Sequence, residues 1–297
     1  MRDIYQGIYI NLARSQKRNE YIKNHLQEIG LLPYFQRFEA LDGDTFCPTT
    51  GGKVLTFYEK ACFSSHLTIM KQLAGQGKHL HIVEDDAYMH KNTKNVLNQA
   101  LKQEGVSDTW DILYLGLYHP IEESVYRYIR DNQALENSLH VFDVRSVPRS
   151  IFGAFSLIIH KDSIAKVVEM LERDLYRTQI DHLYRRYILE GSLRGSSFLP
   201  MLAYPRADAF SSNMKNRTIP ADLLFSDELF ALSLRALFQG TDMREIYDKI
   251  IAFTRNNQIS TSSQIINPTL SDVLEALKQS AQPVLDKRKA YLTKRDK

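Results

Sequence analysis

The sequence lacks most of the features that mark secreted, zinc-finger and membrane proteins. Only two of its 297 residues are cysteine, Cys47 and Cys62, and they form no CxxC pair and no Cys/His spacing typical of zinc sites. The first twelve residues, MRDIYQGIYINL, place acid and amide side chains where a signal peptide has its apolar core. No run reaches the roughly 20 apolar residues of a membrane-spanning helix. We therefore expect a cytoplasmic protein whose two thiols are buried and inert.

The common glycine-rich and catalytic motifs are also missing. No GxxxxGK[ST] loop is present, and Gly51-Gly52-Lys53 lacks its spacing. No GxGxxG opens a helix after the first predicted strand, which argues against a dinucleotide-binding dehydrogenase. Neither the GxSxG elbow of α/β-hydrolases nor the HExxH of zinc proteases occurs. These absences leave nucleotide chemistry to some other arrangement of side chains.

The charge is nearly balanced except at the end of the chain. The composition is ordinary for a globular protein, with 43% apolar residues, 25% charged residues and a net charge of +3. Residues 287–297, KRKAYLTKRDK, carry +5 of this charge, which leaves −2 for the rest. A nearly neutral body argues against nucleic acid as a partner. The basic tail fits either a solvated helix end or peripheral contact with an anionic inner membrane, worth about 1 kcal/mol per basic residue.

Short apolar runs alternate with amphipathic segments in the first two thirds of the chain. In one such segment Ile22, Leu26 and Ile29 recur at helical spacing between a capping Ser15 and Gly30. The pattern predicts strands within 7–12, 34–43, 79–83, 111–116, 151–160 and 196–205, and helices within 15–30, 58–73, 92–103, 161–175 and 182–190. This alternation is typical of βαβ units, so we predict an α/β fold with a mostly parallel sheet.

Two regions depart from this alternation. Residues 120–150 are rich in charge and show no clear period, which predicts a long excursion outside the core. Beyond about residue 220 the pattern turns helical, with predicted helices at 222–238, 242–253 and 271–292. We therefore predict one domain over 1–220 and a helical C-terminal extension, with its basic tail, over 221–297.

The most informative cluster is a run of three acids, Glu84, Asp85 and Asp86, directly after an apolar strand. In a parallel sheet ligands bind outside the carboxyl ends of the strands, where Asn11 and Gly116 are also expected. If the chain stays extended, Glu84 and Asp86 point to the same side. Such oxygen ligands suit Mg²⁺ or Mn²⁺. The alternative is a surface turn with solvated acids.

A set of ordered segments resembles glycosyltransferase family 25, the bacterial lipooligosaccharide galactosyltransferases and their relatives, among them collagen galactosyltransferases. The segments are IYINLARSQKR (8–18), FEALDG (38–43), ACFSSHLTIMKQL (61–73), HIVEDDA (81–87), FGAFSLIIHKDSIAKVV (152–168), IDH (180–182) and LPMLAYPRADAFSS (199–212). The resemblance implies a GT-A-type, Rossmann-like nucleotide-sugar domain. It also implies inverting transfer, typically of galactose from UDP-galactose.

The resemblance also implies roles for residues. Asn11, Arg14 and Arg18 would belong to a nucleotide-side motif, Asp42 and Gly43 to a loop near the base and ribose, and Ser65 and His66 to the helix before the metal strand. Glu84, Asp85 and Asp86 would be the counterpart of the DxD motif, with Glu84 and Asp86 on Mn²⁺ or Mg²⁺. The chain departs from the family pattern at Ala13, at Lys60 and at 204–208, which puts donor preference in doubt.

Inversion needs a base for the proton of the acceptor hydroxyl. Asp181 fills the position that the family pattern reserves for an acid, at the start of a short helix; a plain helix cap is the alternative. Arg14 and Arg206 are candidates to assist the departure of UDP. His66 could be a packing residue or a substrate contact. The metal or acceptor site could be completed by His119, Asp208 or Ser211, and a sugar could stack on Trp110, Tyr114 or Tyr118.

These observations predict a metal-dependent glycosyltransferase that uses a UDP-sugar and extends a lipid-linked saccharide of the lipooligosaccharide type. A non-catalytic sugar- or nucleotide-binding relative on the same fold is the second interpretation, although the intact acid cluster favours an enzyme. A nucleotidyltransferase that uses two metals would need a further acid near the cluster, for which Asp111 and Asp143 are poorly placed.

Overall fold

The computed structural model describes residues 1–48, 55–102, 109–117, 140–146, 153–199 and 201–205. Contacts divide the chain into two units, Met1–Tyr118 with Val141–Arg217, and His119–His140 with Thr218–Lys297. All the described residues except His140 belong to the first unit. The helices predicted beyond residue 220 and the basic tail lie outside the described residues, and the predicted division at residue 220 stays a prediction.

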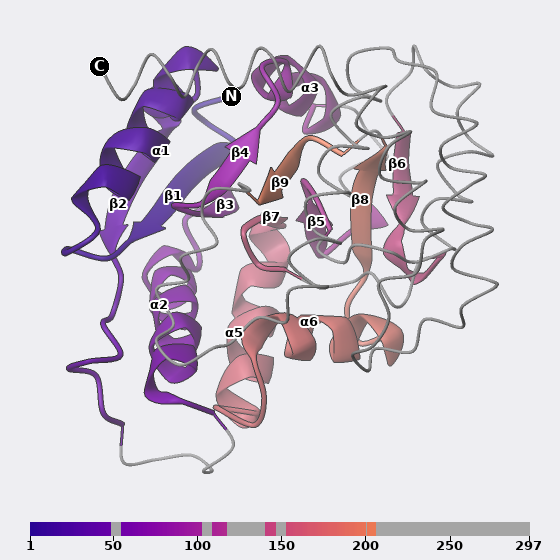
Figure 1. Cartoon of the computed structure of the whole chain (residues 1–297). Coiled ribbons are helices and arrows are strands. Elements are labelled where there is room, and N and C mark those ends of the chain that lie inside the picture. The colour runs from indigo at the N-terminus through magenta and orange to yellow at the C-terminus, as the bar shows by residue number, and fades with distance from the viewer. Residues whose placement is uncertain (49–54, 103–108, 118–139, 147–152, 200, 206–297) are drawn as a thin grey trace, which may run out of the picture. The chain divides into compact units, whose positions relative to one another are not determined.

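A seven-stranded mixed sheet forms the centre of the first unit (Figure 1). Its strand order is β2-β1-β3-β7-β5-β8-β6. The strands are β1 (Tyr5–Asn11), β2 (Phe35–Glu39), β3 (His79–Glu84), β5 (Ile112–Tyr114), β6 (His140–Asp143), β7 (Ser156–Ile159) and β8 (Gly195–Leu199). A separate two-stranded sheet pairs β4 (Ala87–Met89) with β9 (Ala203–Pro205). The α/β class predicted from the alternation of elements is confirmed.

Helices cover both faces of the sheet. Figure 1 shows α2 (Phe57–Leu73), α5 (Ile164–Arg173) and α6 (Ile180–Leu189) together on one side, and α1 (Gln16–Glu28) and α3 (Thr93–Ala100) on the other. Short 3₁₀ turns occur at Leu32–Tyr34, Val144–Ser146 and Lys161–Ser163. Because both faces are covered, almost every residue of β1 and β3 is buried, and these strands read as continuous apolar runs.

Local sequence explains where the main helices begin and end. The Thr56 hydroxyl accepts a hydrogen bond from the Glu59 N–H, and the Glu59 carboxylate accepts one from the Thr56 N–H, so a capping box starts α2. Gly30 has a φ of +69° just after α1, a conformation that favours glycine and stops the helix. The five helices predicted before residue 200 are confirmed, with ends shifted by a few residues.

The sheet is mostly parallel, as predicted, although β7 runs antiparallel to both of its neighbours, β3 and β5. Two other predictions about the sheet were wrong in part. The apolar run at 196–205 is not one strand, because its two halves pair with different partners, β8 with β5 and β9 with β4. Residues 140–143, expected in an excursion outside the core, form the last strand in the sheet order. The rest of the expected excursion, 120–139 and 147–150, lies outside the described residues.

The order of the strands places a topological switch point between β1 and β3. Both strands run parallel, with β2 on the far side of β1, so the chain moves one way from β1 to β2 and the other way to β3. At such a switch point the loops beyond the carboxyl ends diverge and leave room for a ligand. Asn11 ends β1, and Glu84 ends β3. The topology therefore brings these two predicted site segments together.

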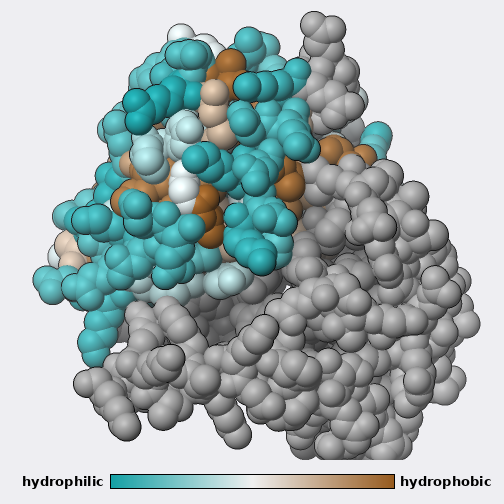
Figure 2. Space-filling model, turned by 90° about the horizontal axis from the view of Figure 1, so that it is seen from above, coloured by the Kyte–Doolittle hydropathy of each residue, from teal (hydrophilic) through white to brown (hydrophobic). Residues whose placement is uncertain are grey.

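One face of the described part is mainly polar. Figure 2 shows that hydrophilic residues make up most of the described surface on one face, with hydrophobic residues between them. Among the described helices, none combines the length and the apolar character that crossing a membrane requires.

Candidate active site

Asn11 links the ends of β1 and β3. Its side chain is 1% exposed, and its amide Nδ2 donates to the Asp85 carboxylate at 2.6 Å and to the Ser15 carbonyl at 3.1 Å. Arg37 of β2 donates from Nε to the amide oxygen of Asn11 at 3.2 Å. One buried amide thus joins β1, the start of α1, β2 and the turn after β3, which fixes these segments relative to one another.

Arg18 of α1 reaches the same turn. Its Nη2 lies 2.7 Å from the Asp85 carboxylate and 2.5 Å from the Asp86 carboxylate. The three side chains are 19%, 8% and 26% exposed, so the ion pairs are partly shielded from water. Because Arg18 carries one charge and the acid run carries three, negative charge at this edge of the sheet is only partly compensated.

Burial shifts the titration of both aspartates. Burial raises the pKa of Asp85 to about 6, and the nearby charges of Asp86 and Glu84 act in the same direction, while Arg18 and the hydrogen bond from Asn11 oppose the shift. The pKa of Asp86 is raised as well, first by burial and further by Glu84, while Arg18 lowers it. Because these carboxylates are buried and close to one another, the binding of a proton or of a cation to them is favoured.

This crowding predicts how Asp85 titrates. We expect a midpoint near pH 6 in the folded protein, measured by carboxyl ¹³C NMR with Asp85→Asn for assignment. Since the ordinary pKa is 3.8, the folded state binds this proton more tightly, and its contribution to stability falls as the pH rises from about 4 to 6. Arg18→Gln should move the midpoint higher, whereas Arg145→Gln, at an exposed Arg145–Asp143 pair, should not. A midpoint near pH 4 in the wild type would contradict this assignment.

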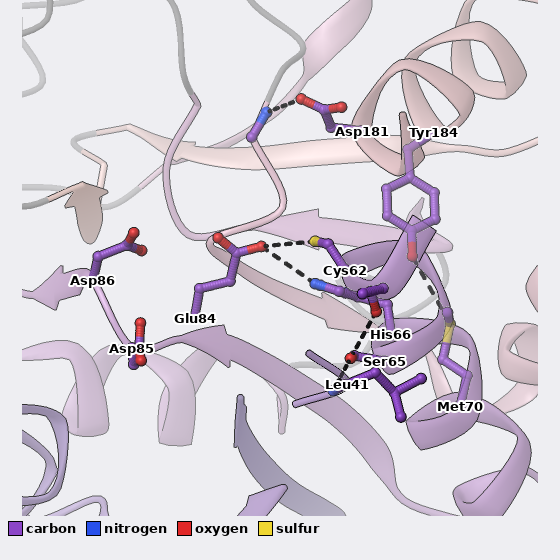
Figure 3. Close-up of polar contacts among 12 residues, drawn as sticks. Leu41, Cys62, Ser65, His66, Met70, Glu84, Asp85, Asp86, Asp181 and Tyr184 are labelled. Carbon is purple, nitrogen blue, oxygen red and sulfur yellow. Dashed lines mark hydrogen bonds and ion pairs between the residues drawn. The ribbon is translucent and has the colours of Figure 1, made fainter. Parts of the chain in front are cut away.

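Glu84 points toward α2. Its Oε1 lies 3.3 Å from His66 Nε2 and 3.9 Å from Cys62 Sγ. Figure 3 shows Glu84 between Asp86 on one side and Cys62 with His66 on the other. The extended chain assumed for Glu84 and Asp86 ends at Glu84, because Asp85 and Asp86 form a turn. The strand alternation predicted from sequence therefore does not govern where Asp86 points.

Cys62 and His66 lie one helical turn apart on α2. His66 is fully buried, and its Nδ1 has no hydrogen-bond partner among the described residues. Since a carboxylate only accepts, His66 donates from Nε2 to Glu84 and orients it. Burial raises the pKa of the Cys62 thiol, and Glu84, Asp181 and Asp86 add to the shift, so the thiol stays protonated. We therefore assign His66 as the hydrogen-bond partner of Glu84.

The loop after β2 is fixed against α2. Arg14 forms an ion pair with Asp42 and lies 3.4 Å from Asp44. The Leu41 N–H donates to the Ser65 hydroxyl at 3.0 Å, a contact drawn in Figure 3. A Cβ on Gly43 would stand 2.6 Å from the Cα of Tyr58, so only glycine fits this approach. Gly43 therefore shapes the loop, whether or not it also contacts a nucleotide.

Asp181 lies in the first turn of α6, not before the helix as its sequence position suggested. Its carboxylate accepts from the Gly153 N–H at 3.3 Å and from the His182 N–H at 2.9 Å. Two residues on, the Phe155 carbonyl accepts from the Glu84 N–H at 2.8 Å. The segment 153–155 thus connects Asp181 with Glu84, and both carboxylates act on the same thiol, Cys62.

Comparison with known proteins gives this arrangement a family. Residues 5–184 match the model described as glycosyltransferase family 25 (LPS biosynthesis protein). The chain belongs to glycosyltransferase family 25. The match covers every residue assigned to the site above, from Asn11 to Asp181, and confirms the resemblance noted in the sequence.

Comparisons with solved structures and with curated proteins say less about this chain than the family match does. Ten solved chains match, among them the crystal structure of a glycosyltransferase involved in the glycosylation of the major capsid of PBCV-1. That comparison covers 63% of this chain and 74% of the other, at 10% sequence identity and a TM-score of 0.33. No curated protein matches.

The residues of this family 25 chain fit a divalent cation held by carboxylates. The Glu84 side chain is 31% exposed, and Asp86 Oδ1 is buried with no hydrogen-bond partner among the described residues. Both oxygens are hard ligands of the kind that Mn²⁺ and Mg²⁺ take. Asp85 differs, because Asn11 and Arg18 occupy its carboxylate. The structure thus sets Glu84 and Asp86 apart from Asp85.

The structure also shows where several other residues named from the sequence lie. Trp110 and Tyr114 are fully buried, as expected for core aromatics and not for a sugar platform. Asp111 is held by Arg194 and Ser163 and has a pKa lowered to about 2, which is a structural role. Five residues named as candidates lie outside the described part: Tyr118, His119, Arg206, Asp208 and Ser211.

Sequence reasoning missed Cys62 and Arg37 as neighbours of the site. Cys62 was expected to be inert, and Cys47, also expected to be buried, is exposed. A signal for Cys62 did exist, because C-x-x-x-H within a helix puts both side chains on one face. Arg37 carried no such signal, because its contact with Asn11 depends on strand pairing across 26 residues.

Proposed function

We propose that this chain is a metal-dependent, inverting glycosyltransferase that moves galactose from UDP-galactose to a saccharide acceptor of the lipooligosaccharide type. The observation that carries the proposal is the gathering of Asn11, Arg18 and the acids Glu84–Asp86 at the β1–β3 switch point, inside the part of the chain that matches family 25. A GT-A-type nucleotide-sugar fold is part of the same proposal.

The donor nucleotide would bind beyond the carboxyl end of β1, at the switch point. Arg14 and Asp42 lie in the segments that follow β1 and β2, and contacts with Ser65 and Tyr58 of α2 hold the second segment in place. A preformed loop of this kind lowers the entropy that is lost when a ligand binds. Asn11 and Arg18 would act indirectly, because they fix Asp85 and the turn that carries Asp86. Their role is to position the acids.

Glu84 and Asp86 would hold Mn²⁺ or Mg²⁺, which when bound supplies positive charge opposite the diphosphate of the leaving UDP. The Asp86 oxygen without a partner and the partial exposure of Glu84 support these two residues as ligands. His66 donates a hydrogen bond to the Glu84 carboxylate and limits its rotation. Arg18 offsets part of the charge on the two aspartates when the nucleotide is absent.

Asp181 is proposed as the base. The acceptor hydroxyl oxygen attacks the anomeric carbon, the bond from that carbon to the UDP oxygen breaks, and the hydroxyl proton passes to the Asp181 carboxylate. The attack comes from the face opposite the leaving group, so the configuration inverts. The Gly153 N–H donates a hydrogen bond to this carboxylate and fixes its orientation.

The acceptor and the place of action follow from the family and the tail. Family 25 is described by LPS biosynthesis, and its acceptors would be lipid-linked saccharides. The basic residues 287–297 would hold a cytoplasmic enzyme at the anionic face of the inner membrane, where such an acceptor lies. No nucleic-acid partner is proposed.

The test measures UDP released from a panel of UDP-sugars by the full chain, with Mn²⁺ or with EDTA, and with extracted lipooligosaccharide as acceptor. We expect UDP-galactose to be consumed in the presence of Mn²⁺ and not in the presence of EDTA. If UDP binds while no sugar is transferred to any acceptor in the panel, the non-catalytic relative replaces this proposal. If UDP does not bind with or without metal, the acid cluster is structural and the proposal fails.

A further inference from the structure

Three side chains of the kind that bind metal ions lie together on the side of Glu84 that faces α2. Cys62 Sγ, His66 Nε2 and a Glu84 carboxylate oxygen all lie within 4.8 Å of one another. Two of the three come from one face of α2, four residues apart, and the third comes from the end of β3. A helix pair together with an acid from a neighbouring element is a common way to present three ligands to one ion.

We propose that Cys62, His66 and Glu84 form a binding site for one thiophilic divalent metal ion, such as Zn²⁺. The inference goes beyond the proposed sugar transfer and does not depend on it. It shares one residue, Glu84, with the carboxylate site proposed for Mn²⁺ or Mg²⁺. Its other two ligands, a thiol and an imidazole, are of the kind that Zn²⁺ prefers and Mg²⁺ does not.

The distances are close to those that such a site requires. Bond lengths of about 2.3 Å to sulfur and about 2.0–2.1 Å to nitrogen and oxygen put tetrahedral ligand atoms about 3.4–3.6 Å apart. The distance from His66 Nε2 to Glu84 Oε1 is 3.3 Å, and that from Cys62 Sγ to Glu84 Oε1 is 3.9 Å. Figure 3 shows the three side chains facing one another.

The charge around the thiol favours a cation. The ionisable groups that act on Cys62 are three carboxylates, Glu84, Asp181 and Asp86. Arg18 pairs with Asp85 and Asp86, and among the described residues it forms no ion pair with Glu84. A divalent ion beside Glu84 would therefore offset negative charge that Arg18 does not. On binding, the thiol proton leaves to solvent and the imidazole proton moves from Nε2 to Nδ1, which frees Nε2 as the ligand atom. Three protein ligands leave one position for water or a substrate oxygen.

Use of Glu84 by this site has a consequence for the proposed enzyme. A carboxylate drawn toward Cys62 and His66 is withdrawn from Asp86, with which it would share Mn²⁺ or Mg²⁺. A thiophilic ion at this site should therefore weaken Mn²⁺ binding. The two sites differ in the residues that they do not share, which are Cys62 and His66 on one side and Asp86 on the other, so variants can separate them.

The test uses Co²⁺ alone as the probe, added to the full chain after treatment with a chelator. Binding through a thiolate gives an absorption band from sulfur-to-Co²⁺ charge transfer, which we expect to saturate at one equivalent and to disappear when Zn²⁺ is added. Cys62→Ser should abolish the band, and His66→Gln should weaken binding more than about tenfold. Cys47→Ser is the matched control, because Cys47 is the exposed second cysteine, and it should leave the band intact.

Two further comparisons separate this site from the proposed donor-metal site. Asp86→Asn should keep the Co²⁺ band while it loses Mn²⁺ binding, and Cys62→Ser should do the reverse. Should His66→Gln not fold, alkylation of the wild type replaces it, with Zn²⁺ expected to slow the reaction of Cys62 and not that of Cys47. A wild type without the band, or a band that survives Cys62→Ser, overturns the proposal, whatever the sugar-transfer assay gives.

Discussion

Asp181→Asn should lower kcat for sugar transfer by about 10²–10⁴-fold, the range that a general base contributes, while the KM for the UDP-sugar changes little. The reason is that an amide cannot take the proton from the acceptor hydroxyl. The amide oxygen can still accept the hydrogen bond from the Gly153 N–H, so the variant keeps the contact that joins α6 to the 153–155 segment. The measurement is steady-state kinetics of transfer with Mn²⁺ present.

Asp162→Asn is the matched control for this prediction. Asp162 is also an acid in the first turn of a short helix, but its side chain is 76% exposed and its carboxylate lies 3.6 Å from His160 Nδ1. Its substitution should leave kcat unchanged. A small effect of Asp181→Asn on kcat, together with a lowered melting temperature, would mean that Asp181 is a helix cap and that the base lies elsewhere.

The second large effect is expected at Asp86. Asp86→Asn should reduce Mn²⁺-dependent turnover by about 100-fold or more, because charge that a metal stabilises in the transition state is worth several kcal/mol. Mn²⁺ affinity, measured by calorimetry or by electron paramagnetic resonance, should fall with it. The fold should survive, because Arg18 keeps its pair with Asp85 and because burial already disfavours the ionised form of Asp86.

Glu169→Gln on the exposed face of α5 is the control, since it removes one negative charge far along the chain from the acid run. It should change neither Mn²⁺ affinity nor turnover. Asp85→Asn gives a useful contrast, because Asp85 is held by Asn11 and Arg18 and is proposed to position the turn. Unchanged Mn²⁺ affinity in Asp86→Asn would remove Asp86 from the metal site.

Much of the fold could be predicted from local patterns. Helix α2 follows from its apolar period and from the capping residues Thr56 and Glu59. Strands β1 and β3 follow from apolar runs of strand length, because both faces of each are buried. The direction of β7 could not be predicted, since an apolar run of four residues fits a parallel or an antiparallel neighbour equally well.

The sequence predicted which residues belong to the site better than it predicted which of them are in contact. The acid run and the family pattern pointed to Asn11, Arg18, His66 and the acids, but not to which of them meet. Asn11 contacts Asp85 across 74 residues, and Arg18 contacts Asp86 across 68. Such pairs depend on the order of the strands and on how α1 packs, which no short-range period encodes. The alternation of side chains in an extended strand separated Asp85 from Glu84 and Asp86 in the prediction, but it could not show which residues each acid contacts.

The sequence by itself determined the class of the fold, the main helices and strands, the acid run at the end of β3 and the membership of family 25, because each of these depends on residues near one another or on an ordered pattern along the chain. Only the tertiary structure decided how the acids divide: Asp85 goes to Asn11 and Arg18, while Glu84 goes to His66 and Cys62. The physical reason is that a carboxylate takes its partners from whatever the packing of strands and helices brings within about 3 Å, and that packing is a property of the whole chain.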